Sequence, residues 1–509
     1  MSEQRPNILI IQADQLAAPA LKCYGNPVSK TPNIDALAED GVVFDSAYCN
    51  NPLCAPSRFS MMAGQHASAI GAYDNGAEFL ADIPTFAHYL RAGGYRTSLC
   101  GKMHFVGADQ LHGFEERLTT DVYPADHGWA PDWERPDHRF DWWYHNMDSV
   151  HEAGPCERTN QIDFDDETGF CAQRHLYDMA RDRDERPFCM TVSFTDPHDP
   201  YACPKRFWDL YEGETINLPG VGHIPYEQCD PHSRRLRHAY KMDREEIPDE
   251  AIQRARRAYY GQISYVDEKI GNLVKALEDT GMKENTIVIF TADHGDMLGE
   301  RGLWYKMSLH EWSARVPFIV SAPEKFSPAR SNTPVSLVDL LPTLMDLTRA
   351  HDTTAPADRM DGNSLVPILR GEAGDSDRPV ISEYLGEGAV APMVMVRQGR
   401  FKLIHCPVDP PLLYDLSADP DELDNLAEKE AFRPVMAKLT AIVTGHRDLD
   451  RLHENIVASQ KRRRLVFKAH MTGKHTPWDF QPVVDASVRY MRNHLDLNDV
   501  EGRARIKSV

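Results

Sequence analysis

Four short apolar segments of this chain each run into residues that can bind an ion or carry a proton. The segments are 7–11, 96–100, 188–194 and 286–291, and the residues that follow them are Asp14, Lys102, His104, Asp196, His198, Asp293 and His294. An aspartate after a strand is often only a turn residue, so no single position argues for a site. The repetition of the pattern after four similar segments predicts one shared polar pocket.

The residue types in this pocket suit a metal ion and proton transfer. Asp14 and Asp293 offer carboxylate oxygens, which are good ligands for calcium, magnesium and manganese. His104 and His198 carry imidazole groups, the side-chain type best suited to give or take a proton during a reaction at neutral pH. We therefore expect a divalent cation and general acid–base chemistry in one place.

A lone cysteine, Cys54, stands in the segment CAPSR at 54–58, where a helix is expected to begin. From residue types alone its thiol could fill the core, sense oxidation, act as a nucleophile, or be the precursor of a different nucleophile. Arg58, Lys102 and Lys306 add positive charge, and an arginine can bind two oxygens of a tetrahedral oxyanion at once. These charges predict an anion beside the metal ion.

Apolar strands and amphipathic helices alternate through most of the chain. The expected strands are 7–11, 42–48, 96–100, 188–194, 286–291 and 317–322, and they look like buried parallel strands; the expected helices are 31–41, 85–94, 251–281 and 336–348. This alternation predicts an α/β fold with a large mixed, mostly parallel sheet sandwiched by helices. Ligands of such sheets bind at the carboxyl ends of the strands, where the polar residues stand.

The pattern changes from about residue 380 onward. Short alternating segments with glycine and proline between them predict a smaller antiparallel sheet, and a helix is expected near 428–447. We predict a catalytic α/β domain at 1–378, a small α+β subdomain at 379–455 and a C-terminal extension at 456–509.

The bulk composition argues against several classes of protein. The chain has 509 residues, 42% of them hydrophobic, and a net charge of −21, which disfavours nucleic acid as a partner. No segment reaches the roughly 20 apolar residues of a membrane span, and the first residues lack the features of a signal peptide. The ten cysteines show no paired spacing. We therefore expect a cytoplasmic protein with reduced thiols.

Six segments, in their order along the chain, carry a resemblance to a known family. They are ADQ (13–15), CAPSR (54–58), GKMH (101–104), PHDP (197–200), TADHGDMLGERGLWYK (291–306) and LYDLSADPDELDNLA (413–427). With them the chain resembles the type I sulfatases of the alkaline-phosphatase-like superfamily over most of residues 5–450. The resemblance implies that a formylglycine-generating enzyme converts Cys54 into formylglycine. One hydroxyl of the aldehyde hydrate would attack sulfate, and deprotonation of the other would later expel it.

The resemblance also implies a role for each polar residue. The ligands of one divalent metal ion would be Asp14, Asp293, His294 and the modified Cys54. Asp293 would also accept the proton of the nucleophile, and Arg58 and Lys102 would hold that nucleophile. His104 would help to break down a sulfo-enzyme intermediate, while His198 and Lys306 would stabilise or protonate the leaving oxygen.

Two positions depart from the commoner sulfatase pattern. Gln15 stands where many members have a second aspartate, and His294 stands where many have asparagine. An amide carbonyl is a weaker ligand than a carboxylate, and a neutral histidine nitrogen suits manganese or another transition ion. Calcium is the first expectation for the metal, with manganese and magnesium as alternatives. The same pair of residues also occurs in the phosphonate monoester hydrolases of the superfamily.

Three further segments resemble the choline sulfatase subfamily. They are HRFDWWYHNMD (138–148), FKAHMTGKHTPWDFQP (467–482) and VRYMRNHLDLNDVE (488–501). This resemblance implies hydrolysis of choline-O-sulfate to choline and sulfate. It also implies a homo-oligomer, a dimer or a tetramer, in which the extension helps assembly and reaches an active site.

A trimethylammonium group is bound by aromatic faces with a carboxylate nearby. The aromatic candidates are Trp129, Trp142, Trp143, Tyr144 and His145, and the candidate carboxylates are Glu383, Glu387 and Asp499. We expect Trp129 and His145 to contact the choline group and Asn75 to contact the sulfate. Each ring taken alone is better explained by packing of a loop against the core, and only the group favours a cation pocket.

Three hypotheses therefore stand at this point. The first is a choline-O-sulfate hydrolase. The second is a phosphonate monoester or phosphodiester hydrolase with the same nucleophile, which Gln15 and His294 support. The third is a binding protein that keeps the fold without catalysis because Cys54 is never converted.

Overall fold

The computed structural model describes residues 5–140, 145–244, 246–475, 477–482, 485–489, 491 and 495–504. Its centre is an eight-stranded sheet with the order β11-β2-β10-β9-β1-β7-β4-β5. The strands are β1 (Asn7–Ala13), β2 (Gly41–Phe44), β4 (Arg96–Gly101), β5 (Glu116–Arg117), β7 (Phe188–Ser193), β9 (Thr286–Ala292), β10 (Phe318–Ser321) and β11 (Ala329–Ser331).

Strands β9, β1, β7 and β4 are parallel neighbours in the middle of this sheet. They are almost entirely buried, and β1 and β9 are rich in Ile, Val, Leu and Phe, as expected for strands that helices cover on both faces. Because parallel strands point the same way, their carboxyl ends meet at one edge of the sheet. The polar residues that follow these four strands are thereby brought together.

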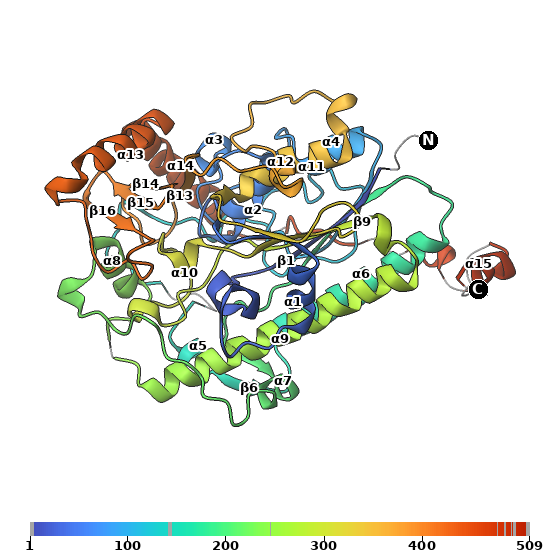
Figure 1. The fold of residues 1–509 in the computed structure, drawn as a ribbon, viewed down its shortest axis with the longest axis horizontal. Helices are drawn as coiled ribbons and strands as arrows, with labels where there is room; N and C mark the ends of the chain where they lie inside the picture. Colours follow the sequence, from blue (N-terminus) through green and yellow to red (C-terminus); the bar gives the residue numbers. More distant parts are fainter. Residues whose placement is uncertain are drawn as a thin grey trace.

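Helices cover both faces of the sheet, as predicted (Figure 1). One layer contains α1 (Pro32–Glu39), α6 (Asn160–Arg181) and α9 (Asp249–Asp279), and α9 packs against the other two. The opposite layer contains α2 (Cys54–Ala63), α4 (Phe86–Ala92) and α11 (Leu340–Thr348), with α11 packed on α2 and α4. The expected α/β fold with a mixed, mostly parallel sheet is confirmed.

Two of the expected parallel strands are corrected by the structure. Strand β10, from the segment 317–322, runs antiparallel to both β9 and β2. A buried strand has the same apolar composition in either direction, so the sequence pattern did not reveal its orientation. The segment 42–48 is divided between β2 and β3 (Ala47–Tyr48), which pairs with β12 (Val335–Ser336) outside the large sheet.

The C-terminal part contains a separate four-stranded antiparallel sheet, β13-β14-β15-β16. Its strands are Val380–Tyr384, Met393–Gln398, Phe401–Cys406 and Asp409–Asp415, and α13 (Arg433–His446) packs on β14 and β15. Helix α14 (Leu449–His470) follows at once, and α15 (Leu497–Ala504) lies at the opposite end of the molecule from this sheet (Figure 1).

Shorter elements lie in the connections. They are α3 (Ala67–Ile70), α5 (Asp148–His151), β6 (Gly154–Cys156), β8 (Ala202–Pro204), α7 (Lys205–Asp209), α8 (Pro231–Ala239), α10 (Glu311–Ala314) and α12 (Val366–Leu369). Within the described ranges, no helix combines the length and the apolar character that crossing a bilayer requires.

Candidate active site

Helix α2 begins at Cys54, and its first turn is buried beneath the carboxyl edge of the large sheet. The side chain of Leu53, which precedes the helix, cannot cap it. Asn75 takes over this function, because its Oδ1 accepts a hydrogen bond from the backbone N–H of Ala55 at 3.0 Å. The Cys54 side chain therefore lies at the positive end of a helix whose start is held by a distant loop.

Four potential ligands converge at this point, namely Asp14, Cys54, Asp293 and His294. One ligand atom of each lies within 4.8 Å of the others, and all four residues are buried. Nε2 of His294 lies 3.2 Å from Sγ of Cys54, while its Nδ1 lies 3.0 Å from the carbonyl oxygen of Gly295. A proton on Nδ1 leaves Nε2 free to bind a cation. Two carboxylates and an imidazole nitrogen form a donor set that fits a divalent metal ion.

Arg58 fixes the two carboxylates of this group. Its Nη2 lies 2.7 Å from Asp14 and its Nε lies 2.8 Å from Asp293, with all three side chains fully buried. The remaining nitrogen, Nη1, donates to the backbone carbonyl of Lys102 at 2.7 Å and to Oγ of Ser193 at 2.8 Å. Arg58 thus ties together the ends of β1, β4, β7 and β9.

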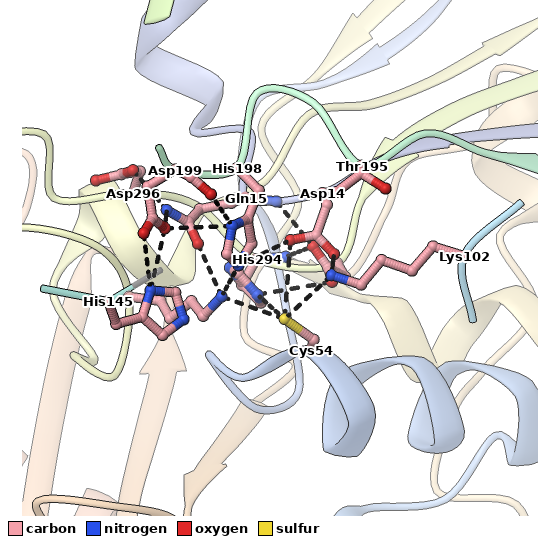
Figure 2. A network of polar contacts seen from close by, with 12 residues as sticks. Asp14, Gln15, Cys54, Lys102, His145, Thr195, His198, Asp199, His294 and Asp296 are labelled. Carbon is pink, nitrogen blue, oxygen red and sulfur yellow. Dashed lines mark hydrogen bonds and ion pairs between the residues drawn. The ribbon is translucent and has the colours of Figure 1, made fainter. Parts of the chain in front are cut away.

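Two lysines approach the cysteine. Nζ of Lys306 lies 3.2 Å from Sγ of Cys54, and Nζ of Lys102 lies 3.8 Å from Sγ and 2.6 Å from Asp14. Burial opposes ionisation of the thiol, but Lys102, Lys306 and His294 together hold the pKa of Cys54 well below its usual value. The position of Sγ is therefore one at which negative charge is stabilised (Figure 2).

A second chain of contacts leads away from Lys306. Its Nζ lies 2.8 Å from Nε2 of His198, whose Nδ1 lies 2.6 Å from the backbone carbonyl of Asp199. The Asp199 carboxylate lies 3.0 Å from Nδ1 of His145. Burial lowers the pKa of His145 to about 4, against the attraction of Asp199. The predicted substrate residue His145 thus contacts Asp199 through one ring nitrogen (Figure 2).

His104 is also buried, and its ring interacts with the side chain of Cys54. Its backbone N–H donates to the carboxylate of Asp121 at 2.9 Å, which sets its position after β4. Burial lowers the pKa of His104, while Cys54 acts in the opposite sense. Apart from Cys54, none of the described residues is within hydrogen-bond reach of its ring nitrogens, which are therefore available to other atoms.

Gly101 allows β4 to approach β7 immediately before Lys102. Its φ is +97°, and a Cβ at this position would lie only 2.0 Å from the carbonyl oxygen of Ser193. Several other residues of the site adopt a left-handed backbone although they are not glycine: Gln15 (61°), His104 (58°), Tyr305 (65°) and Met307 (66°). Such strain is held in place by surrounding contacts and concentrates at functional sites.

The aromatic side of the site is built by Trp129 and Tyr123. The Trp129 ring lies 6.4 Å from the His104 ring and 5.9 Å from the Tyr123 ring, measured between centroids. Nζ of Lys102 stands 4.3 Å from the centroid of Tyr123. Sequence reasoning did not select Tyr123, although its closeness to Trp129 in the segment VYPADHGW was a usable signal.

The three candidate carboxylates have different surroundings. Glu383 is engaged by Ser68 and by Nε2 of His446 at 2.6 Å. Asp499, in α15, forms an ion pair with Arg183 at 3.1 Å. Glu387 is only 2% exposed, and no residue that the structure describes gives its Oε2 a hydrogen bond.

The environment of Glu387 links it to the catalytic end of the sheet. Burial raises its pKa to about 8, Asp74 acts in the same sense, and Lys306 opposes them. A buried carboxylate with an unpartnered oxygen is costly unless a ligand supplies the partner.

The side chain of Gln15 contacts a lysine and two carboxylates. Its Oε1 accepts from Lys306 at 2.8 Å, and its Nε2 donates to Asp296 at 2.7 Å and Asp199 at 3.1 Å. Gln15 thereby connects Lys306 to the loop that carries His198 and Asp199.

The structure brings together most of the residues singled out in the sequence. Those around the start of α2 are Asp14, Asn75, Lys102, His104, Trp129, His198, Asp293, His294 and Lys306, with Arg58 inside the helix. Trp142, Trp143 and Tyr144 lie outside the described residues. The roles predicted for these residues stay predictions.

Comparisons with known proteins agree with this geometry. Residues 6–350 match the family described as "Sulfatase". Residues 299–448 match "N-sulphoglucosamine sulphohydrolase, C-terminal", and residues 454–506 match "Choline sulfatase enzyme C terminal".

Individual relatives cover most of the chain. The "Choline-sulfatase" of Rhizobium meliloti is 47% identical over 512 residues, which is 99% of each chain. An "Arylsulfatase" of Clostridium perfringens is 29% identical over 84% of this chain and 92% of its own. Among solved structures, the phosphonate monoester hydrolase of Agrobacterium radiobacter superposes with a TM-score of 0.69 at 24% identity, covering 88% of this chain and 96% of its own. At that identity the superposition shows a shared fold.

Proposed function

This chain belongs to the sulfatase family, and we propose that the sulfate ester it hydrolyses is choline-O-sulfate, giving choline and sulfate. The main support is the match to the Rhizobium meliloti choline-sulfatase over 99% of both chains, together with the match of residues 454–506 to the choline sulfatase C terminus. The chemistry of the pocket agrees, because an unpartnered carboxylate and an indole ring lie near the lysines that would bind sulfate.

We infer that Cys54 is the precursor of formylglycine, made by a formylglycine-generating enzyme. In this structure Sγ stands in for the hydroxyl groups of the aldehyde hydrate, which would supply the nucleophile. Lys102 and Lys306, at 3.8 and 3.2 Å from Sγ, would stabilise negative charge on that oxygen and on the sulfate. Asn75 would hold the start of α2 in place under the substrate.

A divalent metal ion would be held by Asp14, Asp293, His294 and the modified Cys54. Bound there, it would polarise the sulfate oxygens and lower the pKa of the nucleophile. Calcium is our first candidate, with manganese and magnesium as alternatives. Burial raises the pKa of Asp293 against the effect of Arg58, and a carboxylate with a raised pKa is better suited to accept a proton.

Hydrolysis adds water across the S–O bond, so the choline oxygen must gain a proton as it leaves. We assign that proton transfer to His198, whose Nε2 is in contact with Lys306 at 2.8 Å. The Asp199 carbonyl beside Nδ1 would orient the ring. His104, on the other side of Cys54, would remove the proton whose loss releases sulfate.

Trp129 and Glu387 would bind the trimethylammonium group, by cation–π contact and by charge respectively. His145 would line the same region, with Asp199 fixing its ring. A trimethylammonium group has no N–H to donate, so it would interact with the ionised Glu387 carboxylate through charge, which would give choline esters an advantage over neutral ones.

The remaining expectations are part of the same proposal. They are the division into 1–378, 379–455 and 456–509, a homo-oligomeric assembly, and a cytoplasmic location. The exposed apolar side chains of the C-terminal extension, among them Leu465, Met471 and Met491, support self-association.

The deciding experiment compares choline-O-sulfate with 3,3-dimethylbutyl sulfate, in which carbon replaces nitrogen. It requires protein whose Cys54 peptide has the mass of the aldehyde. We expect kcat/KM to be at least about tenfold lower for the neutral ester, or about 1.4 kcal/mol. Equal values would refute cation recognition, and faster turnover of a phosphonate monoester would favour phosphonate hydrolysis instead.

A further inference from the structure

Helix α14 of the C-terminal extension makes a buried ion pair with the catalytic part of the same chain. Nη1 and Nη2 of Arg463 lie 2.5 and 2.7 Å from the two carboxylate oxygens of Asp74. The Arg463 side chain is 9% exposed and that of Asp74 is 0% exposed. Two parallel contacts from a planar guanidinium fix the orientation of the carboxylate as well as its position.

Asp74 begins a turn that touches the nucleophile helix. Its Oδ1 also accepts from the backbone N–H of Gly76 at 3.0 Å, which shapes the turn. The residue between them, Asn75, accepts the N–H of Ala55 next to Cys54. A displacement of Asp74 would therefore also move Asn75 and, through it, the start of α2.

The same turn supports the segment that carries Trp129. Nδ1 of His127 lies 2.9 Å from the carbonyl oxygen of Gly76. A Cβ on Gly76 would lie 2.5 Å from the backbone nitrogen of Ala130, so the turn and this segment are in close backbone contact. A larger residue at Gly76 would collide with the backbone of Trp129 and Ala130.

Helix α14 also contacts this segment directly. Oε1 of Gln460 accepts from the backbone N–H of Trp133 at 3.0 Å, and the Phe467 ring lies against Gly128. Nε1 of Trp133 in turn donates to the carbonyl of Gly386, the residue before Glu387, at 2.9 Å. One face of α14 thus supports both residues assigned to the cation.

We propose that Arg463 is a positioning residue for cation recognition, which acts by holding the 74–76 turn against the segment that carries Trp129. The inference rests on the proposed function. It assigns to the C-terminal extension a task within its own subunit, separate from assembly. Arg463 itself contacts neither the nucleophile nor the pocket aromatics; its effect passes through Asp74.

The test uses Arg463→Met in the full-length protein, with Arg462→Met as the matched control. Arg462 is the neighbouring residue of α14 and is exposed, so its replacement removes the same charge from the same helix. The readout is the ratio of kcat/KM for choline-O-sulfate to that for 3,3-dimethylbutyl sulfate, after Cys54 conversion is verified by mass. We expect the ratio to fall by about tenfold in Arg463→Met and to stay unchanged in Arg462→Met.

A general loss of structure would lower both rates together and leave the ratio unchanged, and that outcome overturns the proposal. If Arg463→Met does not fold, Arg463→Lys gives the same test, because lysine keeps the charge but loses the two-point contact. Asp74→Asn should also reduce the ratio, but by less than Arg463→Met, because loss of the Asp74 charge favours the ionised form of Glu387. Adding Arg463→Met to Asp74→Asn should change the ratio little further. A wild-type protein without any preference for the cation would refute the proposed function and this inference with it.

Discussion

Sγ of Cys54 lies 3.2 Å from Nε2 of His294, although the two residues are 240 positions apart in the chain. Helix α2 brings Cys54 to this point, and β9 brings His294. Because these two residues are in contact, the first turn of α2 lies at the carboxyl edge of the sheet. Both residues are buried, so replacements can be chosen that change chemistry with little change in shape.

Replacement of Cys54 should abolish turnover and preserve the fold. Cys54→Ala would remove the proposed precursor of the nucleophile, and we expect kcat to fall at least about a thousandfold. The free energy of unfolding should change by only about 1 kcal/mol, because one small side chain is shortened. Cys189→Ala is the matched control, since Cys189 is equally buried within β7. A Cys54→Ala enzyme with substantial activity would place the nucleophile elsewhere.

Loss of the charge at Glu387 should affect the two esters differently. We expect Glu387→Gln to lower kcat/KM for choline-O-sulfate by about tenfold and to leave that for the neutral isostere nearly unchanged. Glu383→Gln is the control within the same region, because Glu383 is bound by Ser68 and His446. Glu383→Gln should lower the free energy of unfolding without changing the ratio of kcat/KM for the two esters. Equal losses on both esters in Glu387→Gln would contradict cation binding.

The same carboxyl group predicts a pH dependence. Burial and Asp74 raise the pKa of Glu387 to about 8 from the ordinary value of 4.5. Because only the ionised form attracts a cation, kcat/KM for choline-O-sulfate should rise as the pH passes through about 8 and level off above it. Glu387→Gln should lack this rise. A pH profile of both enzymes checks the prediction, and an identical rise in the variant would assign it to another group.

The contribution of Glu387 to the stability of the fold should fall as the pH rises, whereas its contribution to kcat/KM should increase. Between about pH 4.5 and pH 8 the folded protein keeps a proton on Glu387 that the unfolded chain has lost. The contribution of this group to the free energy of unfolding therefore falls as pH rises through that window. Glu387→Gln should be more stable than the wild type at pH 8, with a smaller difference at pH 5. Denaturant unfolding of the wild type and of Glu387→Gln at pH 5 and at pH 8 measures these free energies.

Arg58 is expected to be a large contributor to stability. Arg58→Met would leave Asp14 and Asp293 buried without their shared partner, and we expect a loss of about 3–5 kcal/mol in the free energy of unfolding. The exposed Arg462→Met provides the comparison and should change stability by less than about 0.5 kcal/mol. An equally small effect of Arg58→Met would mean that the two carboxylates are neutralised in another way.

Removal of divalent cations should inactivate the enzyme reversibly. We expect a chelator to lower kcat strongly and to lower the melting temperature, since a bound cation stabilises only the folded state. Adding calcium, manganese or magnesium singly should then rank the three ions by recovered activity. Full activity after exhaustive chelation, with no metal detected by elemental analysis, would refute the metal site.

The sequence alone was sufficient for the α/β fold and for the grouping of Asp14, Lys102, His198 and Asp293. Each follows an apolar segment, and parallel neighbours in a sheet must present their carboxyl ends at the same edge. The orientation of β10 was not accessible in this way, because burial produces the same apolar pattern in parallel and antiparallel strands.

Only the tertiary structure decided which partner each polar side chain has. It showed that Gln15 bonds to Lys306, that His145 bonds to Asp199, and that Oε2 of Glu387 is unpaired within the described part of the chain. It also joined Arg463 to Asp74 across 389 positions. Local patterns of residue type encode secondary structure and burial, whereas such pairings depend on how distant segments pack, and that is set by the whole fold.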